Sequence, residues 1–290
     1  MADPFAPIRR LVKTPSDAVR WASVLEVTAP KAGNVYPGAS FRDLSFIDFV
    51  AAADIASKHL RDEQERFSRR IYGAVEETRE LTKTNVNLGI LLLLGPLVAA
   101  DELMMRVGNN KCKANDWLEA TRIVLDSLDG EDGQNVFRAI QVAGAGGLGE
   151  VESMDIAAMY GEVDLIEAMT LAKDRDRIAN QYATGFSDLI DNVLPVVWHS
   201  IDQTGDLLEG IGRAHIQLLR DEVDSLIARK NGMEVAKSIQ RRAARVNLGD
   251  PDSVQKFDQS LRGDTHELNP GTTADLVAAS LYLLLRTPIF

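Results

Sequence analysis

The sequence predicts an all-α fold: a single-domain bundle of many helices over residues 1–290, with a buried apolar helix at its centre. Three observations favour this class. Good helix formers (Ala, Leu, Glu, Lys and Arg) dominate the segments with helical periodicity. No run alternates β-branched or aromatic residues with polar ones between turn signals, as a strand would. No internal repeat and no Ser-, Gly- or Pro-rich linker divides the chain.

The first two helices have clear start signals. Thr14 can cap a helix that begins at Pro15, with Asp17 three residues after the cap. Ser45 can cap the next helix, again with an acidic residue three positions later. The segment 164–194 is expected to form one or two helices that end before Pro195. The other periodic segments predict helices over about 67–81, 87–107, 114–128, 134–143, 206–230, 233–246, 251–261 and 272–285.

The most apolar run of the chain covers residues 88–100. Gly89, Gly95 and Pro96 interrupt it, and it is shorter than the roughly 20 residues that a helix needs to cross a bilayer. It therefore predicts a helix that is buried inside the protein, at the centre of the bundle.

Composition excludes several classes of protein. The 32 basic and 43 acidic residues give a net charge of −11, which argues against a general nucleic-acid binder. A single cysteine excludes an internal disulfide framework and a zinc site built from several cysteines. Residues 1–13 contain no apolar segment long enough for a signal peptide. These features indicate a cytoplasmic protein that binds neither nucleic acid nor membrane, with self-association left open.

Polar residues gather in the loops that flank the predicted helices. Lys31 and Asn34 follow the first long helix, which carries Glu26 near its end. Two amides, Asn85 and Asn87, precede the most apolar helix, where they could bind an oxyanion or sugar hydroxyls; a plain helix cap accounts for one of them. Near the start of the last helix, a carboxylate could cap the helix or hold a metal ion.

The segment Gly144–Gly149 satisfies the pattern G-x-G-x-x-G. A dinucleotide fold requires a strand before this pattern, whereas residues 136–143 have helical spacing. A flexible loop, or a glycine loop whose backbone approaches a phosphate, is the preferred interpretation. His266 lies in another polar loop, where a solvated side chain is favoured over a functional one.

Five short blocks occur in order along the chain. They are E-V-T-A-P-K-A-G-N-V (26–35) with 41–44 and Phe49, N-V-N-L-G (85–89), Gly146-Gly147 with Gly149-Glu150, D-S-L-I-A-R-K-N-G (224–232), and P-G-T-T-A-D-L-V-A (270–278). Together they resemble the triphosphoribosyl-dephospho-CoA synthase family, over nearly the whole chain. The resemblance implies transfer of a triphosphoribosyl group from ATP to 3′-dephospho-CoA, with release of adenine and with Mg²⁺ as cofactor.

Such a transfer passes through an oxocarbenium-like state, so it needs a carboxylate, a proton donor for the leaving base, and cations for the triphosphate. The expected catalytic residues are Glu26, Asp43, Asp224 and Asp275. The expected nucleotide-binding residues are Lys31, Asn34, Asn85, Asn87, Gly146, Gly147, Arg175, Arg229, Lys230 and Gly271. The expected metal ligands are Glu150, Asp176 and Asp224. For the 175–177 stretch, an ion-paired helix surface is an equal alternative.

The chain departs from the family pattern at some polar positions. Asn87 and Leu88 stand where the family carries a histidine and a lysine, and Ser40 or Phe41 stands where it carries another histidine. Two alternatives follow. The chain could act on another acceptor in the biosynthesis of a one-carbon cofactor of the methanopterin or methanofuran type. It could also be a non-catalytic helical protein for nucleotide binding or assembly.

Overall fold

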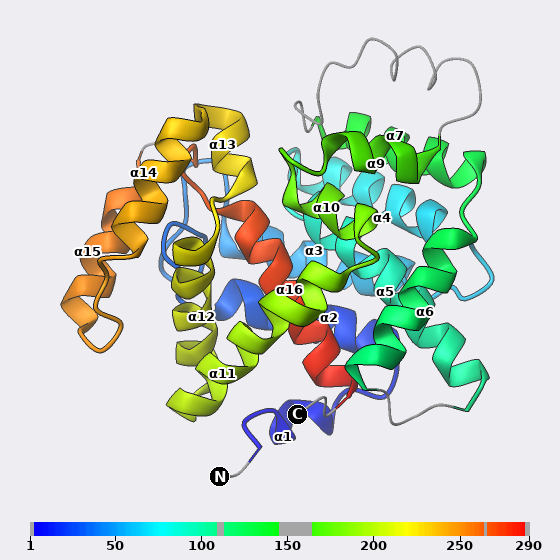
Figure 1. Cartoon of the computed structure of the whole chain (residues 1–290), viewed down its shortest axis with the longest axis horizontal. Coiled ribbons are helices and arrows are strands. Elements are labelled where there is room, and N and C mark those ends of the chain that lie inside the picture. Colours follow the sequence, from blue (N-terminus) through cyan, green and yellow to red (C-terminus); the bar gives the residue numbers. More distant parts are fainter. Residues whose placement is uncertain (1–2, 109–112, 145–163, 264–265, 288–290) are drawn as a thin grey trace.

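The computed structural model describes residues 3–108, 113–144, 164–263 and 266–287. These residues form helices joined by loops, and they contain no strand beyond two isolated bridges, Tyr36 with Ala39 and Phe41 with Leu44 (Figure 1). The predicted all-α class is therefore confirmed. The helices are α1 (Ala6–Arg9), α2 (Pro15–Thr28), α3 (Phe46–His59), α4 (Phe67–Thr82), α5 (Leu88–Arg106), α6 (Ala114–Asp126), α7 (Gly130–Ala143), α9 (Leu165–Ala172), α10 (Arg177–Ala183), a π-helical turn η1 (Asp188–Val193), α11 (Leu194–Thr204), α12 (Leu207–Asp221), α13 (Ser225–Asn231), α14 (Met233–Ala243), α15 (Pro251–Leu261) and α16 (Gly271–Arg286).

Two predicted segments divide differently from expectation. The segment 164–194 contains α9, α10 and η1, and a helix does not end before Pro195. Pro195 instead lies in the first turn of α11, where its missing N–H group is not needed for a helical hydrogen bond. The segment 206–230 is broken before Asp224, which caps α13 by accepting from the Ile227 N–H at 3.0 Å.

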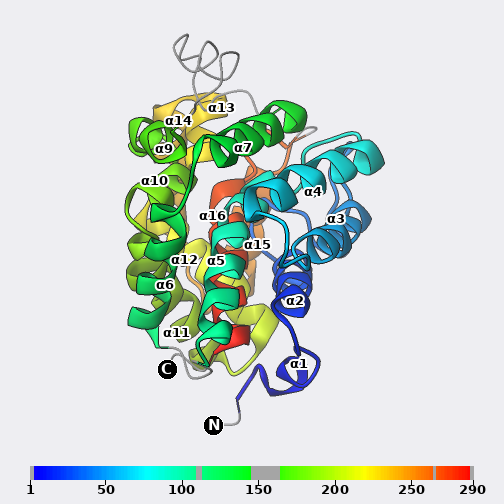
Figure 2. The same cartoon turned by 90° about the vertical axis from the view of Figure 1, so that its right-hand side faces the viewer.

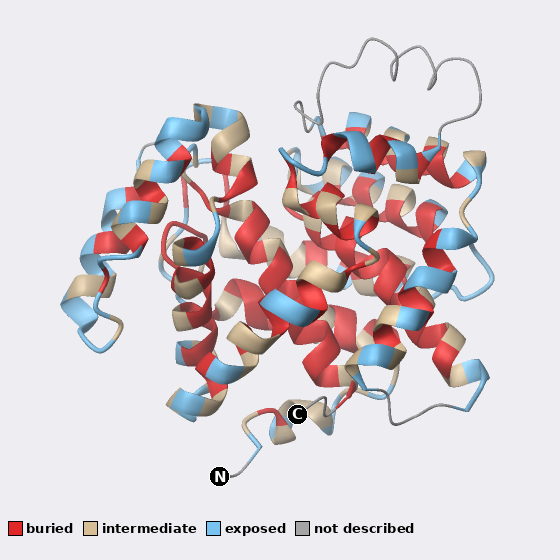
Figure 3. Cartoon of the chain, viewed as in Figure 1, coloured by how far each residue is buried: buried red, intermediate tan, exposed pale blue. Residues whose placement is uncertain are grey.

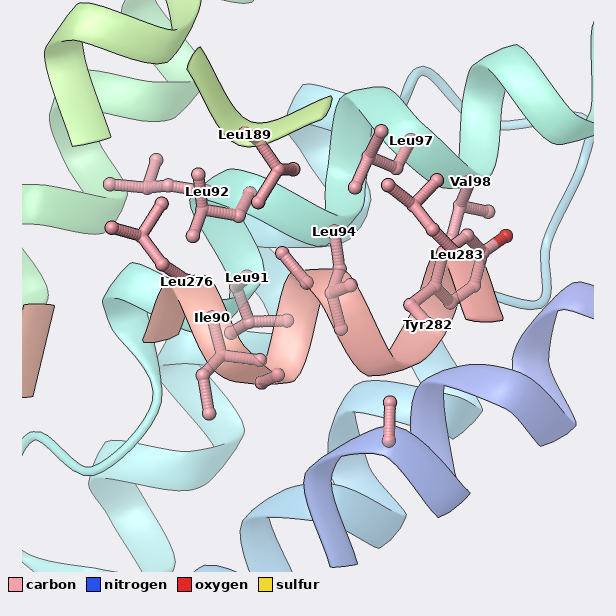
Figure 4. Packing of buried hydrophobic residues seen from close by; sticks show 14 of the residues in the cluster. Ile90, Leu91, Leu92, Leu94, Leu97, Val98, Leu189, Leu276, Tyr282 and Leu283 are labelled. Atoms are coloured by element: carbon pink, nitrogen blue, oxygen red, sulfur yellow. The ribbon is translucent and has the colours of Figure 1, made fainter. Parts of the chain in front are cut away.

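The core forms around two neighbouring helices, α5 and α16, which run side by side through the molecule (Figure 2). Ile90 and Leu92 of α5 lie near Leu276 of α16, and Leu97 and Val98 lie near Leu283 (Figure 4). Residues 276–285 are all buried, which sets α16 apart from the half-exposed helices at the periphery (Figure 3). Burial on all sides explains why neither helix needs a strongly polar face.

The central apolar helix is confirmed, and it tolerates Pro96 in its interior. A proline at this position cannot donate to the Leu92 carbonyl one turn earlier. The Tyr182 hydroxyl of α10 donates to that carbonyl at 2.7 Å, so the freed oxygen keeps a partner. Among the described helices, α5 alone is long and apolar enough to cross a membrane, but 78% of its apolar window is buried inside the protein. This burial identifies α5 as a core helix.

A second apolar cluster joins α12, α13, α14 and α15 and includes Ile216, Ile227, Ile239 and Phe257. It flanks the N-terminal end of α16 (Figure 1). The starts of α5 and α16 therefore lie between this cluster and the helices α2 to α4.

Candidate functional site

A cavity of about 350 Å³ lies where the first turns of α5 and α16 meet. Its wall also includes side chains from α2, α4, α10 and α13 and from the loops before α5 and α16. The cavity gathers most of the described residues that the sequence analysis selected. They are Glu26, Asn34, Asn85, Asn87, Asp176, Arg229, Lys230, Gly271 and Asp275.

Asp275 is the acidic side chain at the centre of this arrangement. Its carboxyl group makes no hydrogen bond or ion pair with any described residue. Withdrawal from water raises its pKa well above the usual range, and the charges of Glu26, Asp224 and Asp176 raise it further, while Arg229 opposes them. A Cβ atom at Gly89 would lie 1.9 Å from Asp275 Oδ2, so glycine is the one residue that leaves room for this carboxyl group. Asp275 is therefore held against the start of α5 in surroundings that favour the protonated form of its carboxyl group.

Glu26 reaches the cavity from α2 and is ion-paired with Lys31. Lys31 Nζ lies 2.9 Å from Glu26 Oε1 and also donates to the Glu26 carbonyl oxygen. Burial raises the pKa of Glu26, and the Lys31 charge opposes the rise. Glu26 Oε2 is buried without a partner in the described residues. Lys31 itself is 0% exposed and does not line the cavity, so it supports Glu26 from behind.

Two further buried polar residues were not selected from the sequence: Asn269 lines the cavity, and His215 lies behind Asn34. His215 Nε2 lies 2.9 Å from Asn34 Nδ2, and burial together with the Lys31 charge lowers the pKa of His215 to about 3. A neutral His215 therefore positions Asn34. Asn269 lines the cavity with a buried Oδ1 that has no partner among the described residues. His215 sits in an ordinary amphipathic helix, so no sequence signal distinguished it.

The two described candidates for metal ligands serve as structural caps. Asp224 accepts from Thr273 N–H and Oγ1, both at 2.8 Å, and thereby ties α13 to α16. Asp176 caps α10 through Oδ1, while its Oδ2 lies 2.6 Å from Arg229 Nη1. The described residues contain no group of three His, Cys, Asp or Glu side chains that could hold a metal ion. The carboxylate oxygens of Asp176 and Asp224 are already engaged in hydrogen bonds and an ion pair, and their role as metal ligands stays a prediction.

Cationic side chains approach the cavity from two sides. Lys230 and Arg229 come from α13, and burial together with the Arg229 charge lowers the pKa of Lys230. Arg79 of α4 also lines the cavity, beside Gly144, and its guanidinium has no hydrogen bond or ion pair within the described residues. Arg175 lies apart, in a neighbouring cavity of about 250 Å³ that shares Asp176 with the first.

The amides before α5 prove to differ in role. Asn85 Oδ1 accepts from the Leu88 N–H at 3.2 Å and so caps the helix. Asn87 Nδ2 points inward and lies 3.4 Å from both Ala52 O and Thr78 Oγ1. A Cβ atom at Gly271 would lie 2.6 Å from Leu226, so this glycine lets α13 approach α16.

The rim of the cavity carries His266, whose Nδ1 lies 3.2 Å from an Asp43 carboxylate oxygen. Its ring packs edge-on against Phe41, with centroids 6.2 Å apart. Asp43 does not line the cavity itself. The expected site residues Gly146, Gly147 and Glu150 lie outside the described residues.

Comparison with known proteins places the chain in one family. The family model described as ATP:dephospho-CoA triphosphoribosyl transferase matches residues 12–288. A crystal structure from Archaeoglobus fulgidus, which carries the provisional name triphosphoribosyl-dephospho-CoA synthase, shares the fold at a TM-score of 0.65 and 24% identity. The alignment covers 83% of this chain and 100% of that one. Among curated proteins, none gives a significant match to the sequence. Because the family model spans nearly the whole chain, the protein belongs to the ATP:dephospho-CoA triphosphoribosyl transferase family and is a transferase.

Proposed function

We propose that the cavity between α5 and α16 is the site at which a triphosphoribosyl group moves from ATP to dephospho-CoA, and that Asp275 is its general acid. The observation that carries this proposal is the unpartnered carboxyl group of Asp275, whose pKa is raised well above its ordinary value by burial and by the neighbouring acids. A neutral carboxylic acid in a cavity can give a proton to a departing base at neutral pH.

The protonated form and the ionised form of Asp275 each have a role in the reaction. The bond between the ribose C1′ and adenine breaks, its electron pair goes to the base, and the Asp275 proton neutralises the departing nitrogen. The carboxylate left behind then stabilises the positive charge on the ribose. The acceptor hydroxyl forms the new bond to C1′ and loses its proton.

Cationic side chains and the N-terminal ends of two helices can bind the triphosphate. Arg79, Arg229 and Lys230 lie on the cavity wall, and α5 and α16 both begin there. Free N–H groups and the positive dipole end make the start of a helix favourable for phosphate. These groups compensate for the lysine and histidine that Leu88 and Asn87 replace.

Mg²⁺ enters the proposal as the counter-ion that accompanies ATP. Mg²⁺ commonly keeps several waters and binds substrate phosphates together with one or two carboxylates. Because Asp176 and Asp224 are engaged, we assign no protein ligand to the ion. Removal of Mg²⁺ with a chelator should stop adenine release, because the triphosphate would then carry its full charge into an acidic cavity.

A direct assay tests the reaction and the acceptor together. The protein is incubated with Mg²⁺-ATP and 3′-dephospho-CoA, and adenine and the triphosphoribosyl product are separated by chromatography. Both are expected in equal amounts, and neither should form without the acceptor. ATP binding by calorimetry without adenine release would leave another acceptor, for which the methanopterin- and methanofuran-type precursors are the next candidates. Absence of both binding and release would leave the non-catalytic assembly role.

The cellular setting is part of the same proposal. The single cysteine, the net charge of −11 and the use of ATP favour the cytoplasm as the place of action. The same acidic charge disfavours nucleic acid and anionic membrane surfaces as partners. Self-association stays open to a sedimentation measurement.

A further inference from the structure

A second titratable pair stands at the rim of the cavity, and the function proposed above does not use it. His266 lines the cavity, and its Nδ1 lies 3.2 Å from Asp43. The two residues come from loops at opposite ends of the sequence, one before α3 and the other before α16. Phe41 packs edge-on against the imidazole, which restricts rotation of the ring.

We propose that His266 is the general base that takes the proton from the acceptor hydroxyl, and that Asp43 is the residue that positions it. This inference rests on the proposed transfer reaction. A carboxylate beside Nδ1 fixes the neutral ring in the tautomer that carries its proton there, so Nε2 is the nitrogen left to accept a proton. The same carboxylate stabilises the imidazolium that forms.

The position of the His266–Asp43 pair also indicates which part of the cavity each substrate occupies. Asp275 lies against Gly89 at the start of α5, whereas the His266 side chain at the rim is 29% exposed. ATP, which must bring its base to Asp275, therefore occupies the inner part. The acceptor approaches from the rim, where His266 meets its hydroxyl group.

Asp275 and His266 together account for both protons that move in the reaction. Asp275 gives one proton to adenine as the bond from C1′ to the base breaks. The acceptor oxygen bonds to C1′, and its proton passes to His266 Nε2. The products are neutral adenine and the triphosphoribosyl O-glycoside of the acceptor. Transfer of the proton from His266 to Asp275 through solvent then restores both groups.

Charges of both signs surround His266. Asp43 faces its Nδ1, and Glu267 is its neighbour in the chain. Lys230 of α13 interacts with the charges of Asp43 and Glu267, and Arg262 lies with its guanidinium carbon 5.6 Å from the Phe41 ring centroid. Substitution of His266 alone leaves all these charges in place, so a change in pH dependence can be assigned to the imidazole.

The test compares two histidines that are each paired with a carboxylate. His266→Gln removes the proposed base, whereas His59→Gln removes an imidazole whose Nε2 lies 2.7 Å from Glu77 and which does not line the cavity. Product formation is measured at saturating ATP and dephospho-CoA between pH 5 and 9. His266→Gln should lower kcat by about 100-fold or more. It should leave ATP affinity within about threefold and abolish the fall in rate at low pH. His59→Gln should match the wild type.

Asp43→Asn tests the positioning role. The expected loss in kcat is about tenfold with KM for both substrates retained, because the ring is then no longer held in the tautomer that leaves Nε2 free to accept a proton. The proposal is overturned if His266→Gln keeps the wild-type kcat, if it raises KM alone, or if kcat falls with an unchanged pH profile. A wild-type protein that forms no product refutes the proposed transfer instead, and with it the base. Circular dichroism on each variant excludes unfolding as the cause of a loss.

Discussion

The two ends of the α5–α16 pair differ in one respect: the cavity end contains a buried acid that has no partner in the described part of the chain, beside acids that are paired. At the C-terminal end, Asp101 accepts from the Tyr282 hydroxyl at 2.7 Å and is ion-paired with Arg286. Next to it, Glu102 forms a two-pronged contact with Arg70 at 2.7 and 3.1 Å. At the N-terminal end, the Asp275 carboxyl group has no partner among the described residues.

This difference distinguishes acids that stabilise the fold from an acid that is available for catalysis. A buried acid that is paired and hydrogen-bonded holds helices together, whereas an unpartnered acid in a cavity is available to a substrate. Burial and the neighbouring like charges both raise the pKa of Asp275, whereas burial raises the pKa of Glu102 and the contact with Arg70 opposes that rise. The four predictions below change one end at a time.

Asp275→Asn should have the largest effect on activity and little effect on folding. Loss of the general acid should lower kcat about 1000-fold, while ATP affinity changes by less than about tenfold. Asp101→Asn is the matched change at the other end. It leaves Arg286 and Tyr282 without their acceptor and should cost about 3 kcal/mol of unfolding free energy, with kcat retained in the folded fraction. Adenine release and urea unfolding measure the two outcomes; equal kcat losses in both variants would contradict the separation.

Lys31→Met should produce the next largest effect, this time at the cavity end. It leaves the buried Glu26 carboxylate without its cation and should reduce the unfolding free energy by about 3 kcal/mol at pH 8. The double variant with Glu26→Gln should recover much of this loss, because the uncompensated charge is gone. Denaturant unfolding of the single and double variants gives the comparison, and additive losses would show that the pair is not coupled.

Gly89→Ala tests the close approach of α5 to Asp275. The added Cβ atom would fall 1.9 Å from Asp275 Oδ2, so the carboxyl group or the helix must move. The expected loss is about 2 kcal/mol of unfolding free energy together with reduced kcat. Gly210→Ala is a control for packing alone, because its Cβ atom would lie 2.5 Å from the Ile201 backbone, away from the cavity. If Gly210→Ala loses as much kcat as Gly89→Ala, the effect at residue 89 is not specific to Asp275.

The smallest predicted effect concerns pH. A folded-state pKa raised above the unfolded value favours the protonated form, so this contribution to stability is complete below the unfolded pKa and is lost as pH rises through the folded pKa. Asp275→Asn should therefore gain stability relative to the wild type between pH 5 and pH 8. Urea unfolding at both values tests this, and a relative loss at the higher pH would contradict the raised pKa.

The sequence predicted most helices and the cavity's main acids, but not how each acid is used. Start signals such as Thr14 with Asp17 are local, and the structure retains them. The role of Asp224 depends on Thr273, which is distant in the chain and donates two hydrogen bonds to it. The sequence pattern could not distinguish the role of Asp224 from that of Asp275. Whether the oxygens of a carboxylate find hydrogen-bond donors is decided only when the helices pack together.

His266 is the reverse case. In the sequence it is a polar residue in a glycine-containing loop, for which solvent exposure is the ordinary expectation. In the structure it meets Asp43 and Phe41 at the cavity rim. No local spacing could reveal this pair, because its members come from loops at opposite ends of the chain.

The contact between Gly89 and Asp275 also predicts how the family can diverge. A carboxyl group at residue 275 and any side chain at residue 89 exclude each other sterically. The two positions should therefore change together during evolution. In family members that have lost the acid at residue 275, residue 89 should no longer be restricted to glycine. The residues at these two positions would therefore indicate which members still hold the acid against the start of α5.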